Sequence, residues 1–210
     1  MKFHKKGLEM SIGLIVVLIL SVLIFSLSLY MVFNWFGKAE VLKAEIDKQT
    51  QEQIKAVLAS GNTLVAIPIP IQQAKRGGSV NFGIGVRNVA EARDFSGAIS
   101  FSGAYTPDGR SISVNEEYLP KNWLGNFNVI QTFSLKKNEQ KLIPILIKVH
   151  TNVAEGVATP KGDYVFNVCL YPAPLKSDGS PPAECTIGQY QHSADLFYTG
   201  KIYQVTVRAV

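Results

Sequence analysis

The chain of 210 residues has a formal net charge of +5, with 47% hydrophobic and only 18% charged residues. This length suits one ordinary domain and an anchor rather than two full domains. Its basic residues do not cluster among aromatic ones, so the composition argues against a nucleic-acid partner.

Residues 12–36 form an almost wholly apolar run. A bilayer core requires about 20 such residues, whereas the apolar core of a secretory signal peptide has only about 7–15. The run therefore predicts a retained transmembrane helix in contact with the lipid bilayer. Its serines fit this prediction, because a helical serine can bond back to a backbone carbonyl. The alternative is a buried core helix of a soluble protein.

Three lysines precede the apolar run, within a basic flank of residues 1–11. Positively charged flanks remain on the cytoplasmic side of a membrane. We therefore expect a single-pass protein of the cell membrane, with a cytoplasmic N-terminus and an extracytoplasmic C-terminal domain.

Residues 37–61 are rich in good helix formers and predict a helical stalk that continues the membrane helix. Apolar residues recur there at roughly helical spacing, among them Ile46, Ile54 and Leu58. This stripe has two interpretations, which are contact with the chain's own β domain and self-association. Gly61 is the expected end of the helix.

Residues 62–210 change from a helical to an alternating period. Prolines 68 and 70 place the first alternating segment at the edge of a sheet. No helical pattern separates the segments, so an all-β, antiparallel sandwich is predicted for this domain. The expected strands lie within 65–71, 80–86, 96–103, 127–135, 143–149, 164–170 and 203–209.

Two stretches of this domain resemble a known family. GGSVNFGIGVRN, residues 77–88, resembles an early strand of immunoglobulin-like domains, and residues 135–170 are similar to their strand E, loop and strand F. Within the latter, Gly162 to Phe166 (GDYVF) resembles the tyrosine corner. Phe166 takes the cysteine position, which implies that the usual inter-sheet disulfide is absent. The resemblance implies an immunoglobulin-like sandwich after one long α-helix, and such domains bind, space or assemble rather than catalyse.

The N-terminus has a resemblance of its own. Lys5-Lys6-Gly7 followed by Leu8, Glu9 and an apolar helix resembles an archaeal class III signal peptide. Such peptides precede type IV pilin-like subunits and archaellum-type, stator-like components. The resemblance implies cleavage between Gly7 and Leu8, and a filament contact through Glu9. Glu9 would be the second mature residue, whereas bacterial pilins carry their glutamate at the fifth. The alternative is an ordinary basic flank.

Cys169 and Cys185 bracket a loop rich in Pro, Gly and Ser. Outside the cytoplasm this pair predicts a disulfide, and closing a loop of about 15 residues would contribute roughly 3 kcal/mol. The alternative is two free thiols. Without a nearby pair of histidines, two cysteines are too few for a zinc site.

Common hydrolase, nucleotide-binding and redox motifs are absent from the sequence, so we expect no catalytic residue, metal or cofactor. The residues best suited to function are aromatic. Tyr118 and Trp123 lie in a long connection, and Tyr190 lies near the cysteine loop. Tyr and Trp are favoured at protein interfaces. The alternative is that they cap the ends of the sandwich.

Three functions remain as hypotheses. The first is a non-enzymatic, membrane-anchored surface protein whose β-sandwich has a structural or protein–protein role, with self-association or a cell-surface protein as partner. The second is a pilin-like subunit, processed after Gly7 and assembled into a filament through the apolar helix. The third is a membrane-tethered hydrolase or sugar-binding enzyme, which no constellation of residues supports.

Overall fold

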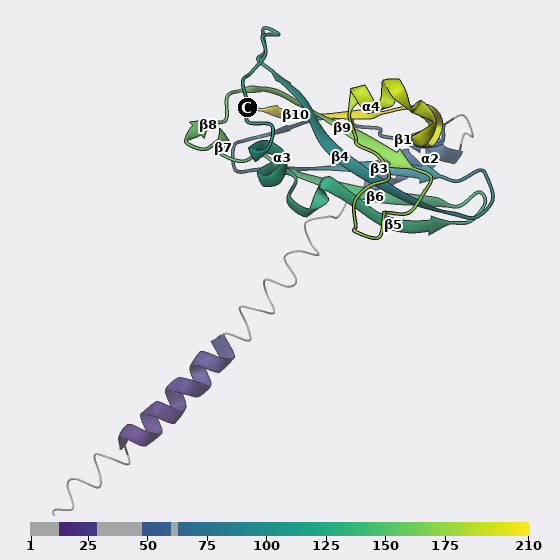
Figure 1. The fold of residues 1–210 in the computed structure, drawn as a ribbon. Helices are drawn as coiled ribbons and strands as arrows, with labels where there is room; N and C mark the ends of the chain where they lie inside the picture. Colours follow the sequence, from purple (N-terminus) through teal and green to yellow (C-terminus); the bar gives the residue numbers. More distant parts are fainter. Residues whose placement is uncertain (1–12, 29–47, 60–62) are drawn as a thin grey trace, which may run out of the picture. The chain divides into compact units, whose positions relative to one another are not determined.

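The computed structural model describes residues 13–28, 48–59 and 63–210 (Figure 1). The chain divides into two compact units, Met1–Lys43 and Ala44–Val210.

The described part of the first unit is a helix over residues 13–28. Its large apolar side chains are all exposed, from 54% at Ile19 to 68% at Leu14. Its serine hydroxyls donate hydrogen bonds to the carbonyl oxygens four residues earlier, as expected from the sequence: Ser21 to Val17, Ser26 to Val22 and Ser28 to Ile24.

Of the predicted membrane segment 12–36, residue 12 and residues 29–36 lie outside the described residues. Among the helices of the described ranges, none combines the length and the apolar character that crossing a membrane requires. The basic flank 1–11 also lies outside the described residues, and so do the expected processing residues Gly7, Leu8 and Glu9.

The described part of the second unit is mostly β structure, and its strands form three sheets. The three-stranded sheet has the order β1 (Val65–Ala66), β3 (Ser79–Arg87), β6 (Gln140–Lys148). The five-stranded sheet has the order β2 (Ile71–Ala74), β10 (Tyr203–Ala209), β9 (Gly162–Tyr171), β4 (Arg93–Tyr105), β5 (Val129–Leu135). The third is a hairpin of β7 (Asn152–Ala154) and β8 (Val157–Ala158).

The predicted β-rich, mainly antiparallel character of this region is confirmed. One pair differs, because β2 runs parallel to β10. The first expected strand is also divided into β1 and β2, which belong to different sheets. Pro68 and Pro70 lie between them and have no N–H to donate, so a single ladder could not continue through both. The predicted location at a sheet edge is correct for both strands.

One hydrophobic core takes side chains from both main sheets. The inward-facing residues that fill it include Phe82, Ile84, Val86, Ile145, Ile147, Phe166, Val168, Val205 and Val207. Tyr164 is also fully buried, and its hydroxyl donates a hydrogen bond of 2.9 Å to the carbonyl oxygen of Pro160. Burial raises the pKa of Tyr164 to about 12, against a smaller lowering by Arg76.

Short helices interrupt the strands, which corrects the expectation that nothing helical separates them. Between β4 and β5 lie α3 (Tyr118–Trp123) and η1 (Gly125–Asn128). Between β9 and β10 lie α4 (Ile187–His192), η2 (Ala194–Leu196) and η3 (Tyr198–Gly200). They are too short for a periodic signal, and α3 forms because Leu119 and Trp123, one turn apart, are both buried in the core.

The predicted stalk 37–61 is described from Lys48 to Ala59, as α2. Two of its apolar residues, Ile54 and Leu58, are buried against the β domain. Contact with the chain's own β domain is therefore the correct interpretation of these two residues.

Candidate interaction surfaces

The connection between β9 and β10, residues 172–202, covers part of the outer face of the five-stranded sheet, and we call it the cap. The predicted disulfide between Cys169 of β9 and Cys185 of the cap is present, with 5.6 Å between the Cα atoms. Both cysteines belong to a second apolar cluster, separate from the main core, which also contains Ala98, Tyr171 and Phe197. The disulfide thus fastens the cap to the central strands of the sheet.

Hydrogen bonds hold the cap along its length. Side chains of the sheet donate to its backbone carbonyl oxygens: Ser96 to Ala173 at 2.7 Å, Tyr171 to Ala183 at 2.7 Å, and Ser100 to Cys185. Burial raises the pKa of the Tyr171 phenol. The sequence showed the cysteine pair but gave no sign of these contacts, which depend on two strands distant in the chain.

A pocket of about 380 Å³ lies beside the cap, and Tyr190 is one of its lining residues. The ring of Tyr190 packs edge-on against Phe197, with 5.8 Å between the centroids. The other lining residues are Ile187, Lys201, Ile202 and Gln204. Tyr190 is half-buried, so it both supports the cap and contributes to a surface that a partner could contact.

Away from the cap, a strip of aliphatic, aromatic and small residues crosses the outer face of the five-stranded sheet. Ile71, Thr206, Val165 and Gly103 lie in register on four neighbouring strands. The ring of Tyr105 lies over Gly103, since a Cβ there would be 3.0 Å from the Tyr105 hydroxyl. Ile71 is 54% exposed and Tyr105 is 45% exposed. We call these five residues the open strip.

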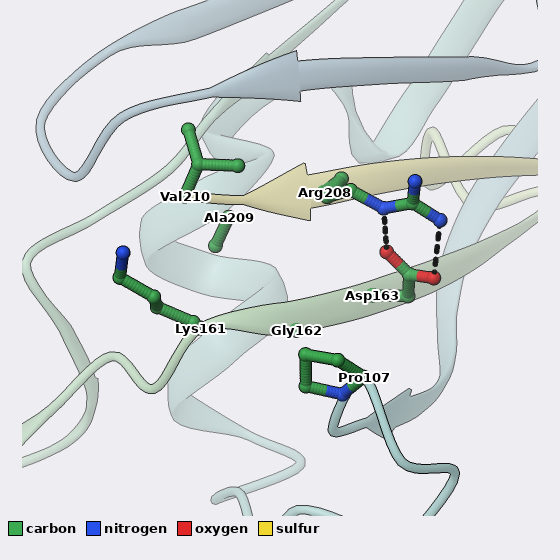
Figure 2. Close-up of a pocket in the computed structure, with 7 residues that line it drawn as sticks. All are labelled: Pro107, Lys161, Gly162, Asp163, Arg208, Ala209 and Val210. Atoms are coloured by element: carbon green, nitrogen blue, oxygen red, sulfur yellow. Dashed lines mark hydrogen bonds and ion pairs between the residues drawn. The ribbon is translucent and has the colours of Figure 1, made fainter.

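An ion pair borders the open strip in the next row of the sheet (Figure 2). Arg208 donates two hydrogen bonds to the Asp163 carboxylate, at 2.7 and 2.9 Å. This pairing lowers the pKa of Asp163 and raises that of Arg208. Because both carboxylate oxygens accept from Arg208, Asp163 is poorly suited to act as a general base.

A pocket of about 350 Å³ opens beside this ion pair. In Figure 2 the Lys161 side chain extends away from the pair, on the far side of Gly162. The remaining lining residues are Pro107, Ala209 and Val210. The pocket therefore offers one lysine ammonium, a neutralised ion pair and apolar groups, which suits contact with a partner better than catalysis.

The two other aromatic candidates lie in different environments. Trp123 is 1% exposed, and its ring lies 4.6 Å from that of Tyr164, so it caps the core. Tyr118 is half-buried, with its hydroxyl 3.5 Å from Nδ1 of His150, and it lines a polar pocket of about 370 Å³. The structure therefore leaves Tyr118 and Tyr190 accessible, at separate sites, and places Trp123 beyond the reach of a partner.

In the part of the chain that the structure describes, no three His, Cys, Asp or Glu side chains gather closely enough to hold a metal ion. The candidate sites are consequently surfaces built from aromatic, aliphatic and paired charged groups. The open strip was not predictable from the sequence, because its members come from strands β2, β4, β9 and β10 and meet only through sheet register.

No protein-family model and no curated protein matches this chain. Among solved structures, it is similar to a family 123 glycoside hydrolase from Clostridium perfringens, with 14% identity and a TM-score of 0.37 over 67% of this chain and 22% of that one. For Spo0M, a sporulation control protein from Bacillus subtilis, the identity is 12% and the TM-score 0.32, over 69% of this chain and 46% of Spo0M. For the class 5 fimbriae chaperone CfaA, the identity is 15% and the TM-score 0.31, over 70% of this chain and 56% of the chaperone.

The chain spans less than two thirds of the length of each of these three proteins.

Proposed function

We propose that this protein is a membrane-anchored, non-enzymatic surface protein that presents an immunoglobulin-like β-sandwich outside the cytoplasm for a structural or protein–protein role. The observation that carries the proposal is the helix over residues 13–28, whose large apolar side chains are all more than half exposed. A large aliphatic side chain left in water costs about 1.5–3 kcal/mol relative to full burial. Lipid is the solvent that relieves this cost along a whole helix.

The sequence on either side of this helix supports the same proposal. The uncharged run extends over residues 12–36, and lysines precede it. A run of this length exceeds the roughly 20 residues that a bilayer core requires, and the lysines favour a cytoplasmic N-terminus.

The disulfide supports the placement of the domain on the other side of the membrane. Disulfides persist in oxidising compartments and are rare in the cytosol. The Cys169–Cys185 bond fastens the cap to the sheet and is buried, since the two cysteines are 0% and 5% exposed. A domain that carries a buried disulfide suits an extracytoplasmic location.

Strand order supports the immunoglobulin-like part of the proposal. Strands β1, β3 and β6 correspond to A, B and E of that fold, and β4, β9 and β10 to C, F and G. The hydrogen bond from Tyr164 to Pro160, near the start of β9, has the form of a tyrosine corner. Both features agree with the resemblance in the sequence.

Protease treatment of intact cells tests the topology. We expect an externally added protease to digest residues 63–210 of the full chain before the membrane is broken. A marker protein of the cytoplasm should survive, as the control for lysis. If the domain is digested only after lysis, the proposed orientation is wrong. If alkaline carbonate releases the chain from membranes, the proposal of a membrane anchor is wrong.

A second candidate function rests on the N-terminal sequence Lys5-Lys6-Gly7-Leu8-Glu9. It is a pilin-like subunit, cleaved after Gly7 and assembled through the apolar helix. The intact mass of the native protein separates the two proposals. Loss of residues 1–7 would support the pilin-like subunit, and a full-length N-terminus would exclude it.

A further inference from the structure

Strand β2 forms one edge of the five-stranded sheet, and in the described part of the chain no strand pairs with its outer side. It runs parallel to β10, and the carbonyl oxygen of Pro70, just before β2, accepts a hydrogen bond of 2.7 Å from the Thr206 N–H. Backbone groups alternate in direction along a strand, so Ile71 and Gln73 point their N–H and C=O groups away from β10. The edge therefore presents the donors and acceptors of both residues to a further strand.

This edge strand is fixed to the rest of the domain by two of its other side chains. Gln72 donates a hydrogen bond of 2.8 Å from Nε2 to the carbonyl oxygen of Asn81, which belongs to β3 of the three-stranded sheet. The Ala74 side chain is buried in the main core. Strand β2 is thus ordered before a partner arrives, which reduces the entropy lost when another strand pairs with it.

The exposed side chains at this edge are apolar at one end and basic at the other. Ile71 is 54% exposed and belongs to the open strip. Lys75 and Arg76 directly follow β2 and are exposed, and neither takes part in an ion pair within the described residues. The surrounding segment, residues 67–78, contains no Asp or Glu. The edge therefore carries positive charge that the segment itself does not balance.

Arg208 of β10 adds to this positive charge. Its Nε and Nη2 donate to the carboxylate of Asp163, and Figure 2 shows the third guanidinium nitrogen directed away from that carboxylate. Because β10 lies between β9 and β2, this positive end of the ion pair faces β2. Gln73 lies in register with Arg208. A carboxylate on a strand beyond Gln73 would therefore be attracted by Arg208 as well as by the lysine that follows β2.

We propose that the outer edge of β2 binds an extended segment of a protein partner as an additional antiparallel strand, with an apolar residue opposite Ile71 and an acidic residue opposite Gln73. Antiparallel pairing is slightly more stable per residue than parallel pairing. Main-chain hydrogen bonds supply the affinity of such a complex, and the alternate side chains supply its specificity. The inference rests on the proposed protein–protein role, although the pairing does not depend on which side of the membrane the domain lies.

Charge favours this partner over a second copy of the chain. Two β2 strands paired with each other would join edges that carry Lys75 and Arg76 and no carboxylate. An acidic segment is instead attracted by both residues. Prolines 68 and 70 limit the length over which any strand can pair, and this suits one specific contact better than open-ended association.

Fluorescence anisotropy tests the proposal with the full chain in a non-ionic detergent and the labelled peptide Thr-Glu-Thr-Val-Thr-Glu-Thr. When its valine lies opposite Ile71, a glutamate lies opposite Gln73. We expect this peptide to bind, and a peptide with lysine in place of both glutamates to bind at least about fivefold more weakly. Absence of binding, or equal binding of the two peptides, would overturn the proposal.

Two variants locate the binding. Gln73→Pro removes a donor that faces the open edge and no hydrogen bond to β10, so binding should be lost while the circular dichroism stays unchanged. Lys75→Glu should abolish the preference for the glutamate peptide. Lys176→Glu is the matched control, because it changes the net charge equally and lies in the cap next to Leu175, whose N–H donates to Thr132 of β5 at the opposite edge. Loss of the preference in this control as well would overturn the assignment to β2.

Sedimentation of the protein without peptide tests the other occupant. A dimer that Gln73→Pro dissociates would assign the edge to a second copy of the chain and overturn the proposal, whereas equal sedimentation of the two proteins supports it. Protease accessibility of the domain in intact cells does not depend on peptide binding. Failure of the proposed topology and failure of this inference are therefore distinguishable.

Discussion

The hydroxyl of Tyr164 donates a hydrogen bond to the carbonyl oxygen of Pro160, four residues earlier, and ties the start of β9 to the loop before it. The bond is intramolecular and local, yet the Tyr164 ring is fully buried and lies against Trp123 from α3. It therefore links a loop, a central strand and a short helix at one end of the domain.

Removing this hydroxyl should destabilise the domain. Tyr164→Phe keeps the ring and leaves the Pro160 carbonyl without its donor, which should cost about 1–2 kcal/mol of the free energy of unfolding. Urea denaturation measures the loss. Tyr105→Phe is the control, since Tyr105 is 45% exposed. Equal stability of the two variants would contradict a structural role for the bond.

The raised pKa of the Tyr164 phenol predicts a loss of stability at alkaline pH. Burial raises its pKa from 10.0 to about 12 in the folded state. Between these values the unfolded chain releases the proton and the folded chain retains it, so the free energy of unfolding falls as the pH rises. Denaturation at pH 9 and pH 11.5 measures this fall. Tyr164→Phe should show a smaller fall than the unaltered protein, and an identical fall would contradict the assignment.

Loss of the disulfide should loosen the cap. Replacing Cys169 and Cys185 together by serine should lower the free energy of unfolding by about 3 kcal/mol, as expected for a loop of this length. The near-ultraviolet signal of Tyr171 and Phe197 should weaken, because both rings pack in the cluster beside the bond. As the control, a reductant should lower the free energy of unfolding of the unaltered protein but not that of the double variant. Unchanged stability of that variant would count against the cap as a structural element.

Truncation of two aromatic residues should change the free energy of unfolding by very different amounts. Trp123→Ala removes a buried ring and should cost about 3–5 kcal/mol. Tyr105→Ala removes an exposed ring of the open strip and should change the free energy of unfolding by no more than about 0.5 kcal/mol. Chemical denaturation of both variants checks the contrast. A large loss from Tyr105→Ala would mean that the open strip is part of the folding core.

The Arg208–Asp163 pair should make only a small contribution that depends on pH. The two side chains are 45% and 33% exposed, so Asp163→Asn should cost less than about 1 kcal/mol at pH 7. Arg208 lowers the carboxyl pKa below 3.8 in the folded state. The contribution is therefore present above pH 3.8 and lost as the pH falls through the folded pKa. A difference between variant and unaltered protein that does not shrink as the pH falls below 3.8 would contradict this assignment, with exposed Asp195→Asn as control.

Alternation in the sequence was sufficient to predict the strands that face the core. Residues such as Phe82, Ile84, Val205 and Val207 recur at every second position and are all fully buried. The cysteine pair was also predictable, because both residues flank one turn-rich loop and Cys169 lies on the opposite face from Val168.

Features that depend on contacts between distant segments were not predictable. The division of the first strand required knowing that β2 would pair with β10, more than a hundred residues later. The burial of Trp123 depends on α3, which is too short to leave a periodic pattern. The docking of α2 depends on Gly85, which in the sequence is only a glycine inside an alternating strand.

The cap also has a consequence for how the protein matures. The 210 residues contain two cysteines, so within one chain there is only one way to pair them. Cys169 lies in β9 between β10 and β4, whereas Cys185 arrives on the connection that follows. Oxidative folding of this chain therefore requires an electron acceptor, but it requires no isomerase to sort one pairing from another.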